Sequence, residues 1–316
     1  MKPFAFVFPG QGSQSVGMLD AWGDHPAVRE TIREASNALD QDLDSLIREG
    51  PKEALALTTN TQPVMLVAGV AAYRAWRTEG GAAPAMVAGH SLGEYSALVA
   101  AGALTLSQAA PLVRYRAEAM QEAVPVGTGA MAAVLGMEAQ DVVAVCAEVT
   151  RSFDTGSGDL VEAVNFNDPG QTVIAGSKAA VDKACELLKA RGAKRALLLP
   201  VSAPFHSSLM RPAADKLKAR LEETEFQAPQ IPVVNNIEAT IESDPGRIRA
   251  ALYQQAFGPV RWVDCIRAMK KSGIDIVVEC GPGKVLAGLV KRIDSGLTGV
   301  ALYDPSSLTQ VRELLA

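Results

Sequence analysis

The chain has 316 residues, of which 48% are apolar and 21% charged, a balance that excludes disordered and coiled-coil chains and is typical of soluble globular proteins. It carries 30 lysines and arginines against 35 aspartates and glutamates, a formal net charge of -5. Because the chain is acidic and only 5% aromatic, it lacks the basic and stacking residues of nucleic-acid binders, and we expect no nucleic-acid partner.

The first part of the chain alternates short apolar strands with longer helices. The predicted elements are a strand over residues 4–8, a helix over 30–38, a buried helix over 62–76 with Pro63 in its first turn, a strand over 85–88 and a helix over 94–101. Strands followed by glycine-rich turns and helices predict an α/β fold, a largely parallel sheet with helices on both faces.

The pattern changes after Pro125, where the run PVGTG predicts a linker. The elements that follow are a strand over 130–135, a helix over 139–149, strands over 161–166 and 171–175, a helix over 179–191 and a strand over 195–200. Residues 167–170 (NDPG) predict a hairpin turn. This βαββαβ order predicts a small ferredoxin-like domain over 126–199, inserted into a large α/β-hydrolase-like domain formed by residues 1–125 and 200–316.

The helix and strand alternation resumes after this insertion. We predict helices over 213–223, 248–257, 263–272 and 284–293, with strands over 232–235 and 274–279. The longest apolar stretch, residues 97–106, is too short to span a membrane, and no secretory leader is recognisable. The four cysteines form no CxxC pair, which is typical of proteins in a reducing compartment. We therefore expect a cytoplasmic protein without a membrane segment.

The stretch GHSLG at residues 89–93 matches the G-x-S-x-G nucleophile elbow and lies between a predicted strand and a predicted helix. The turn would hold the Ser91 hydroxyl at the edge of the sheet, where the N–H groups of a helix N-terminus favour developing negative charge. A flexible glycine and serine turn is the alternative interpretation of these five residues.

Ser91 needs a base, and the chain has only three histidines. The side chain of His90 should point away from its neighbour Ser91, and His25 lies in a polar connector. His206 follows the last strand of the insertion, where a domain boundary favours a pocket, and we favour it as the base over a helix-capping or core role.

Other motifs are weaker. GQG at residues 10–12 lacks the third glycine of the dinucleotide fingerprint, and GPGK at 281–284 is followed by Val285, so it is no Walker loop. Both patterns also fit tight turns at strand ends. The sequence contains no HExxH, and we expect neither a metal nor a cofactor.

Six motifs together resemble one family, the malonyl-CoA:acyl carrier protein transacylases of fatty-acid synthesis. They are FPGQGSQ (8–14), GHSLGEY (89–95), RYR (114–116) with MQ (120–121), PFH (204–206), Gln255 with PVRW (259–262), and ECGPG (279–283). They occur in order from the first predicted strand almost to the C-terminus. Their agreement is far more specific than any one motif alone.

The resemblance implies a two-step transfer. Ser91 attacks the malonyl thioester of coenzyme A while His206 takes its proton, and the thiol of acyl carrier protein then attacks the resulting ester. The family orients this histidine with a backbone carbonyl near the glutamine matched by Gln255. A supporting carboxylate stays open as an alternative.

The resemblance also assigns three further roles. Backbone N–H groups of Gln11 and Leu92 would form the oxyanion hole. Arg116 would bind the malonyl carboxylate with its guanidinium fork, although helix-surface arginines are common. Phe205 would favour malonyl over bulkier acyl groups, with core packing as its alternative role.

Acyl carrier proteins are acidic and this chain is itself net negative, so docking requires a local basic patch. We expect a monomer that docks its carrier through one of two groups of basic residues: Lys183, Lys189, Arg191, Lys194 and Arg195, or Lys284, Lys291 and Arg292. The alternatives are a serine esterase or thioesterase with Asp168 or Asp182 as its third residue, a polyketide-pathway acyltransferase, and a non-catalytic carrier-binding scaffold.

Overall fold

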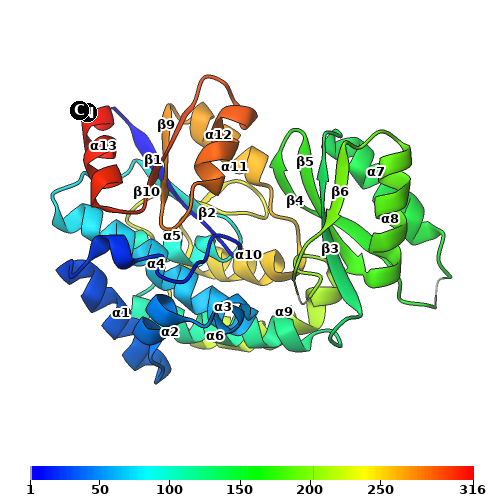
Figure 1. Cartoon of the computed structure of the whole chain (residues 1–316), viewed down its shortest axis with the longest axis horizontal. Helices are drawn as coiled ribbons and strands as arrows, with labels where there is room; N and C mark the ends of the chain where they lie inside the picture. Colours follow the sequence, from blue (N-terminus) through cyan, green and yellow to red (C-terminus); the bar gives the residue numbers. More distant parts are fainter. Residues whose placement is uncertain (1, 155, 202) are drawn as a thin grey trace.

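Two sheets organise the molecule, and Figure 1 shows them in two lobes of unequal size. The structure, a computed structural model, describes residues 2–154, 156–201 and 203–316. The larger lobe contains a six-stranded sheet with the strand order β10-β9-β1-β2-β7-β8, and the smaller lobe contains a four-stranded sheet with the order β4-β5-β3-β6. The chain enters the smaller lobe once and leaves it once, so the two segments at that crossing come from distant sequence positions.

The six-stranded sheet is parallel except at one edge, which confirms the predicted parallel sheet. Its strands are β1 (Phe4–Phe8), β2 (Met86–Gly89), β7 (Val233–Val234), β8 (Ile241–Glu242), β9 (Ile276–Cys280) and β10 (Thr298–Leu302). β1 lies between β9 and β2 and pairs with both in parallel, whereas the edge strand β8 runs antiparallel to β7. A central parallel strand is buried on both faces, which is why β1 has a continuous apolar sequence.

Side chains of β1 alternate between two apolar clusters, so helices cover both faces of the sheet. Phe4, Phe6 and Phe8 face one cluster, and Ala5 and Val7 face the other. The first cluster includes buried residues of the helices α1 (Pro26–Leu39), α2 (Leu43–Glu49), α3 (Lys52–Ala56), α4 (Thr58–Thr78), α5 (Gly93–Ala100), α6 (Leu106–Glu122), α9 (Arg211–Glu223), α10 (Pro245–Phe257) and α13 (Pro305–Leu315). The second includes residues of α11 (Trp262–Lys271) and α12 (Val285–Ile293).

The smaller lobe is a four-stranded antiparallel sheet covered by two helices on one face. Its elements are β3 (Gly129–Leu135), α7 (Ala139–Arg151), β4 (Val161–Asp168), β5 (Gln171–Ser177), α8 (Lys178–Ala190) and β6 (Arg195–Leu198). Buried side chains of α7 and α8 form one cluster with this sheet, whereas Met131, Val164 and Val173 join the main cluster of the larger lobe. The second face of the small sheet therefore packs toward the larger lobe.

Several boundaries differ from the predictions. α4 begins at Thr58, four residues before the predicted start, so Pro63 lies in its second turn and not in its first. Asn167 and Asp168 belong to β4, which shortens the predicted turn to residues 169–170. The elements that we did not predict are α2, α3, α6, β8, β10, α13 and the 3-10 turns Asp20–Trp22 and Ser208–Met210.

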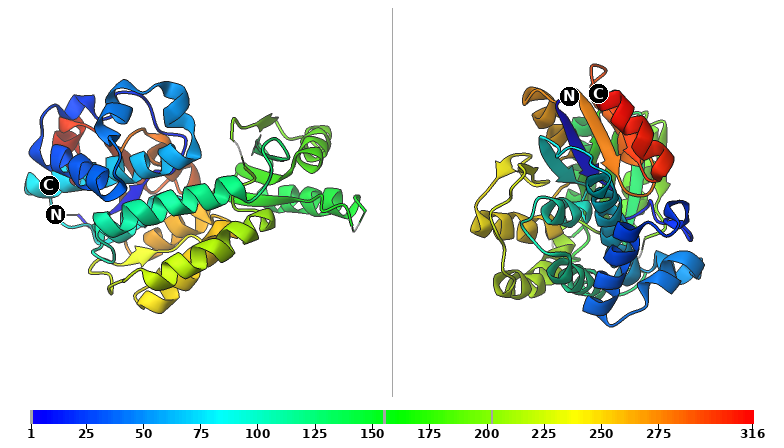
Figure 2. Two further views of the ribbon diagram at one scale, coloured as in Figure 1. Left: turned by 90° about the horizontal axis from the view of Figure 1, so that it is seen from below. Right: turned by 90° about the vertical axis from the view of Figure 1, so that its left-hand side faces the viewer.

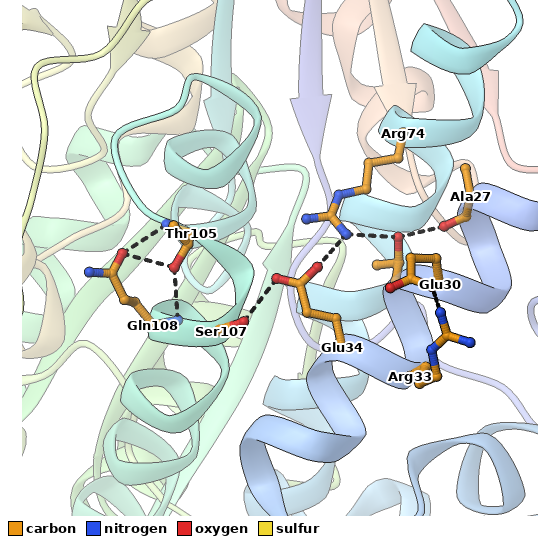
Figure 3. A network of polar contacts seen from close by, with 9 residues as sticks. Ala27, Glu30, Arg33, Glu34, Arg74, Thr105, Ser107 and Gln108 are labelled. Atoms are coloured by element: carbon orange, nitrogen blue, oxygen red, sulfur yellow. Dashed lines mark hydrogen bonds and ion pairs between the residues drawn. The ribbon is translucent and has the colours of Figure 1, made fainter.

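A polar network fixes the long helix that carries Arg116. Glu34 of α1 accepts hydrogen bonds from Arg74 of α4 (2.7 Å) and from Ser107 in the first turn of α6 (3.0 Å), as Figure 3 shows. Thr105 and Gln108 form a capping box at the start of α6. In Figure 2, α6 runs beside α9 toward the smaller lobe. The hydrogen bonds of Glu34 and the capping box thus hold the N-terminal end of α6 beside α1 and α4.

Candidate active site

Ser91 lies in a sharp turn between β2 and α5, as the elbow motif predicts. Its φ of 53° is in the left-handed region, which is unfavourable for a residue with a side chain. The flanking glycines permit this turn, because a Cβ on Gly89 would lie 1.8 Å from the backbone of Gly93, and one on Gly93 would lie 2.1 Å from the carbonyl oxygen of Phe8. The turn therefore requires glycine on both sides of Ser91.

The structure brings Ser91 and His206 together across 115 positions of sequence, with Oγ and Nε2 2.7 Å apart. His206 lies in the loop that returns from the smaller lobe, and its own φ of 66° is also left-handed. Its Nδ1 lies 2.8 Å from the backbone carbonyl oxygen of Gln255. Because a carbonyl oxygen only accepts hydrogen bonds, Nδ1 carries the proton and Nε2 is free to accept from the Ser91 hydroxyl.

Burial keeps the His206 imidazole neutral. The residue is 4% exposed, and burial together with the nearby charge of Arg116 lowers its pKa to about 3. A neutral imidazole with its Nε2 lone pair aimed at a hydroxyl is the state that a general base needs. At neutral pH the imidazole is therefore unprotonated, and its Nε2 can accept a proton from the serine hydroxyl.

Arg116 is buried beside this pair, with partners that carry no charge. Its Nη1 donates to the amide oxygen of Gln62 (2.6 Å), and its Nη2 donates to that of Gln255 (2.9 Å) and approaches Ser91 Oγ at 3.3 Å. Within the described ranges, no carboxylate forms a salt bridge with Arg116, and its Nε has no hydrogen-bond partner. Glu94 is its nearby acid but contacts it only through Gln255, so the buried guanidinium makes no direct ion pair and favours an incoming anion, while burial lowers its pKa.

A cavity opens over Ser91 at the junction of the two lobes. Gly10 approaches the elbow so closely that a Cβ there would lie 2.6 Å from the carbonyl oxygen of His90, which brings Gln11 to the cavity wall. The predicted site residues that line the cavity are Gln11, Ser91, Leu92, Arg116, Phe205 and His206. The smaller lobe and the loop that returns from it contribute Met131, Asn165, Leu199 and Val201. Gln255 lies behind the cavity, where it contacts both His206 and Arg116.

The acids considered for a catalytic triad lie elsewhere. Asp168 accepts a hydrogen bond from Arg292 at 2.7 Å, and Asp182 accepts one from Lys178 at 2.6 Å. Since the Nδ1 of His206 bonds to a backbone carbonyl, neither acid supports the imidazole.

The other two histidines form their side-chain contacts with residues other than Ser91, although His90 also lines the cavity. His90 lies 2.8 Å from Asn167 through its Nε2 and packs against the ring of Trp262. His25 is half-buried at the start of α1 beside Trp22.

In the part of the chain that the structure describes, no cluster of three or more His, Cys, Asp or Glu side chains is arranged to hold a metal ion. None of the described helices is long and apolar enough to cross a membrane.

Sequence reasoning missed three buried polar residues of this site. Gln62 holds Arg116, Asn236 accepts a hydrogen bond from the backbone N–H of Ser91 (2.7 Å), and Glu94 accepts one from Gln255 (2.9 Å). Glu94 is 2% exposed and is the one charged residue of α5, and an isolated acid in such a helix is a signal that points to a buried polar contact. Nothing local in the sequence distinguishes Gln62 or Asn236.

Comparisons with known proteins agree with this geometry. The model of the acyl transferase domain family matches residues 5–298, so the site belongs to an acyltransferase. The malonyl CoA-acyl carrier protein transacylase of Escherichia coli K12 is 52% identical over 99% of this chain and 100% of that relative. The acyl-carrier-protein S-malonyltransferase of Burkholderia pseudomallei 1710b is 60% identical, with a TM-score of 0.95 over 99% of this chain and 100% of that one.

A second solved structure holds a malonyl-transacylase in complex with a type II polyketide acyl-carrier protein. That enzyme is 49% identical, with a TM-score of 0.95 over 99% of this chain and 100% of that one. The chain therefore belongs to the malonyl CoA-acyl carrier protein transacylase family.

Proposed function

We propose that this protein transfers the malonyl group of malonyl-CoA to the phosphopantetheine thiol of acyl carrier protein through a malonyl ester on Ser91. The observation that carries this proposal is the 2.7 Å contact between Ser91 Oγ and His206 Nε2, made beside the buried guanidinium of Arg116. A nucleophile, a neutral base and a fixed positive charge at one cavity are the groups that malonyl transfer requires.

In the first half-reaction, His206 Nε2 takes the Ser91 proton as Oγ attacks the thioester carbonyl. The C–S bond then breaks, and the proton passes from Nε2 to the departing coenzyme A sulfur. In the second half-reaction, Nε2 accepts the proton of the carrier thiol, its sulfur attacks the ester, and Oγ leaves with that proton. The backbone carbonyl of Gln255 stabilises the imidazolium in both halves, because it accepts the Nδ1–H at 2.8 Å. Nε2 protonates the leaving group in both halves, the coenzyme A sulfur in the first and Ser91 Oγ in the second, so the proposed steps use no triad acid.

The oxyanion hole consists, in this proposal, of the backbone N–H groups of Gln11 and Leu92. Leu92 follows Ser91 at the N-terminus of α5, and Gln11 lines the cavity beside the same turn. The helix N-terminus favours the negative charge that develops on the carbonyl oxygen. Loss of one well-placed donor costs about 3 kcal/mol of transition-state stabilisation.

Specificity for malonyl comes, in this proposal, from Arg116 and Phe205. A malonyl group differs from an acetyl group by a carboxylate, which is costly to bury without a partner. Arg116 offers a fixed charge next to the nucleophile, because Gln62 and Gln255 hold its two terminal nitrogens. Phe205 is 9% exposed at the cavity wall, where its ring would exclude branched acyl groups.

We further propose that a basic edge of the smaller lobe docks the acidic carrier protein. Lys194 and Arg195 are exposed in or beside the edge strand β6, and the chain continues from there to Leu199 and Val201 in the cavity wall. In the other predicted group, Arg292 is paired with Asp168 and Lys284 stacks on Tyr303, so two of its three charges are already engaged.

Charge reversal separates the two groups. Lys194→Glu with Arg195→Glu should raise the KM for acyl carrier protein and leave the KM for malonyl-CoA unchanged, whereas Lys284→Glu with Lys291→Glu should alter neither. A raised carrier KM in the second double variant alone would assign docking to α12.

We also propose how the chain divides into domains, what its oligomeric state is and where in the cell it lies. We propose an α/β-hydrolase-like large domain over residues 1–125 and 200–316 with a ferredoxin-like small domain over 126–199, which the antiparallel order β4-β5-β3-β6 supports. A monomer without a cofactor suffices for the reaction, because the proposed site residues belong to one chain. Four free and buried cysteines support a cytoplasmic location.

Transfer from labelled malonyl-CoA to holo-acyl carrier protein tests the function, with the apo carrier, which lacks the thiol, as the control. The proposal expects label on the holo carrier only. Release of free malonate without carrier, at a rate that matches transfer, would instead indicate a thioesterase.

A further inference from the structure

Glu94 occupies the centre of a buried polar network behind the Ser91 and His206 pair. It lies in the first turn of α5 and is 2% exposed. A single carboxylate oxygen, Oε2, accepts two hydrogen bonds, one from the backbone N–H of Asn236 (3.0 Å) and one from the side-chain amide of Gln255 (2.9 Å). These two residues in turn contact the nucleophile and its base.

The Asn236 branch holds the strained backbone of the nucleophile. The Asn236 side chain accepts the N–H of Ser91 (2.7 Å) and donates to the carbonyl oxygen of Gly89 (2.7 Å), so it closes the elbow across both ends. A left-handed φ at a serine persists only where surrounding contacts fix it.

The Gln255 branch holds the base and the guanidinium. The Gln255 amide nitrogen donates to Glu94 Oε2 and to the Ser91 carbonyl oxygen (3.0 Å), while its amide oxygen accepts from Arg116 (2.9 Å). Flipping this amide would set its oxygen against the carboxylate and its nitrogen against the guanidinium, so Glu94 and Arg116 together allow one orientation. The backbone carbonyl of the same residue accepts the Nδ1–H of His206.

We propose that Glu94 is a positioning residue that holds the elbow of Ser91 and the anchor of His206 in one geometry, through Asn236 and Gln255. The inference rests on the proposed roles of Ser91 and His206. Glu94 acts as a hydrogen-bond acceptor in this role, because its one oxygen satisfies both donors. Burial raises the pKa of Glu94 to about 7, which agrees with a role that does not depend on a full negative charge.

Two substitutions of Glu94 distinguish the effect of losing its hydrogen-bond acceptor from the effect of losing its negative charge. Glu94→Gln keeps an oxygen for both donors and removes the charge, whereas Glu94→Ala removes the acceptor. We expect Glu94→Ala to lower kcat for malonyl transfer about tenfold to a hundredfold with the KM for malonyl-CoA nearly unchanged, and Glu94→Gln to retain kcat within about threefold.

Histidine NMR reports the hydrogen bonding of the His206 ring independently of catalytic turnover. With 15N-labelled histidine the chain gives signals from only three side chains, and His206→Ala identifies the signal of interest. In the unsubstituted protein His206 should be the Nδ1–H tautomer with a slowly exchanging proton. Glu94→Ala should lose that protection, and Glu94→Gln should keep it.

Asn236→Ala provides a second route should Glu94→Ala fail to fold. It removes the side-chain contacts of the elbow and leaves the Gln255 branch intact, so acylation of Ser91 should slow about tenfold while the His206 signal stays unchanged. A kcat in Glu94→Ala equal to that of the unsubstituted protein, or an equal loss in Glu94→Gln and Glu94→Ala, would overturn the inference. Full activity of Ser91→Ala and His206→Ala would instead overturn the proposed function.

Discussion

Two turns leave the same edge of the parallel sheet on either side of β1, and they place different residues in the left-handed region. The turn from β2 to α5 puts Ser91 there, with φ 53°, whereas the turn from β9 to α12 puts Gly281 (φ 129°) and Gly283 (φ 90°) there. Glycine adopts these angles without strain, and serine does so only where its neighbours hold it. The second turn connects β9 to α12, whereas the first turn presents the hydroxyl of Ser91.

Each turn also buries one glutamate with a different set of partners. Glu94 accepts from Asn236 and Gln255, which reach Ser91 and His206, while Glu279 at the end of β9 accepts the backbone N–H of Ala287 in α12. Burial raises the pKa of both carboxyls to about 7. Similar local architecture therefore becomes a reactive centre only where distant segments bring a base and a charge to it.

The largest expected effect is on the base that reaches the first turn. His206→Ala should lower malonyl transfer by about 10^3-fold to 10^4-fold, because Ser91 loses its proton acceptor. Steady-state transfer to holo-carrier measures it, with His25→Ala at the start of α1 as the matched histidine control. A His206→Ala protein within tenfold of the unsubstituted rate would remove the distinction between the two turns.

Glycine substitutions compare the steric demands of the two regions. Gly89→Ala should lower the free energy of unfolding by about 3 kcal/mol or more, because its Cβ would lie 1.8 Å from the backbone of Gly93. Gly288→Ala within α12 meets nothing within 4 Å and should raise stability by up to about 1 kcal/mol. Urea denaturation measures both, and equal stabilities would contradict the tight packing of the elbow.

The charge beside the first turn should separate acyl groups. Arg116→Ala should lower malonyl transfer about tenfold to a hundredfold more than acetyl transfer, since only malonyl carries the carboxylate that pairs with the guanidinium. Arg114→Ala, on the same helix but directed at Gln41, is the matched control and should lower both alike or neither. An equal loss of both acyl transfers in Arg116→Ala would exclude the carboxylate contact.

The buried glutamate of the second turn should affect stability and not turnover. Because its folded pKa of about 7 lies above the unfolded value, the folded protein binds more protons between about pH 4.5 and 7, and stability falls as pH rises through that window. Glu279→Gln should remove about 2 kcal/mol of this fall between pH 5 and 8 and leave kcat unchanged. Identical pH profiles of unfolding in the two proteins would refute this.

What the sequence predicts well is what neighbouring residues determine. The elbow follows from glycines within two residues of Ser91, and β1 follows from its continuous apolar run. Elimination among three histidines predicts His206 as the base, a step that a chain with more histidines would not allow. Only the resemblance to a family indicates Arg116 and Gln255.

What the sequence leaves open is fixed by contacts between distant residues. Asn236 reaches Ser91 across 145 positions and Gln255 reaches Glu94 across 161, and no local periodicity encodes such pairs. The edge strand β10 is only half-buried, which weakens its apolar pattern. By contrast α13 has a readable start, because Asp304 caps it and Pro305 occupies its first position.

The central claim is that the hydroxyl of the β2 to α5 turn carries the acyl group. Mass spectrometry of a rapid digest after incubation with malonyl-CoA, in the absence of carrier, tests it directly. We expect one malonyl mass on the peptide that contains Ser91, removed by added holo-carrier and absent from Ser91→Ala. A malonyl group on another peptide, or efficient transfer by a protein that never acquires the added mass, would contradict the account.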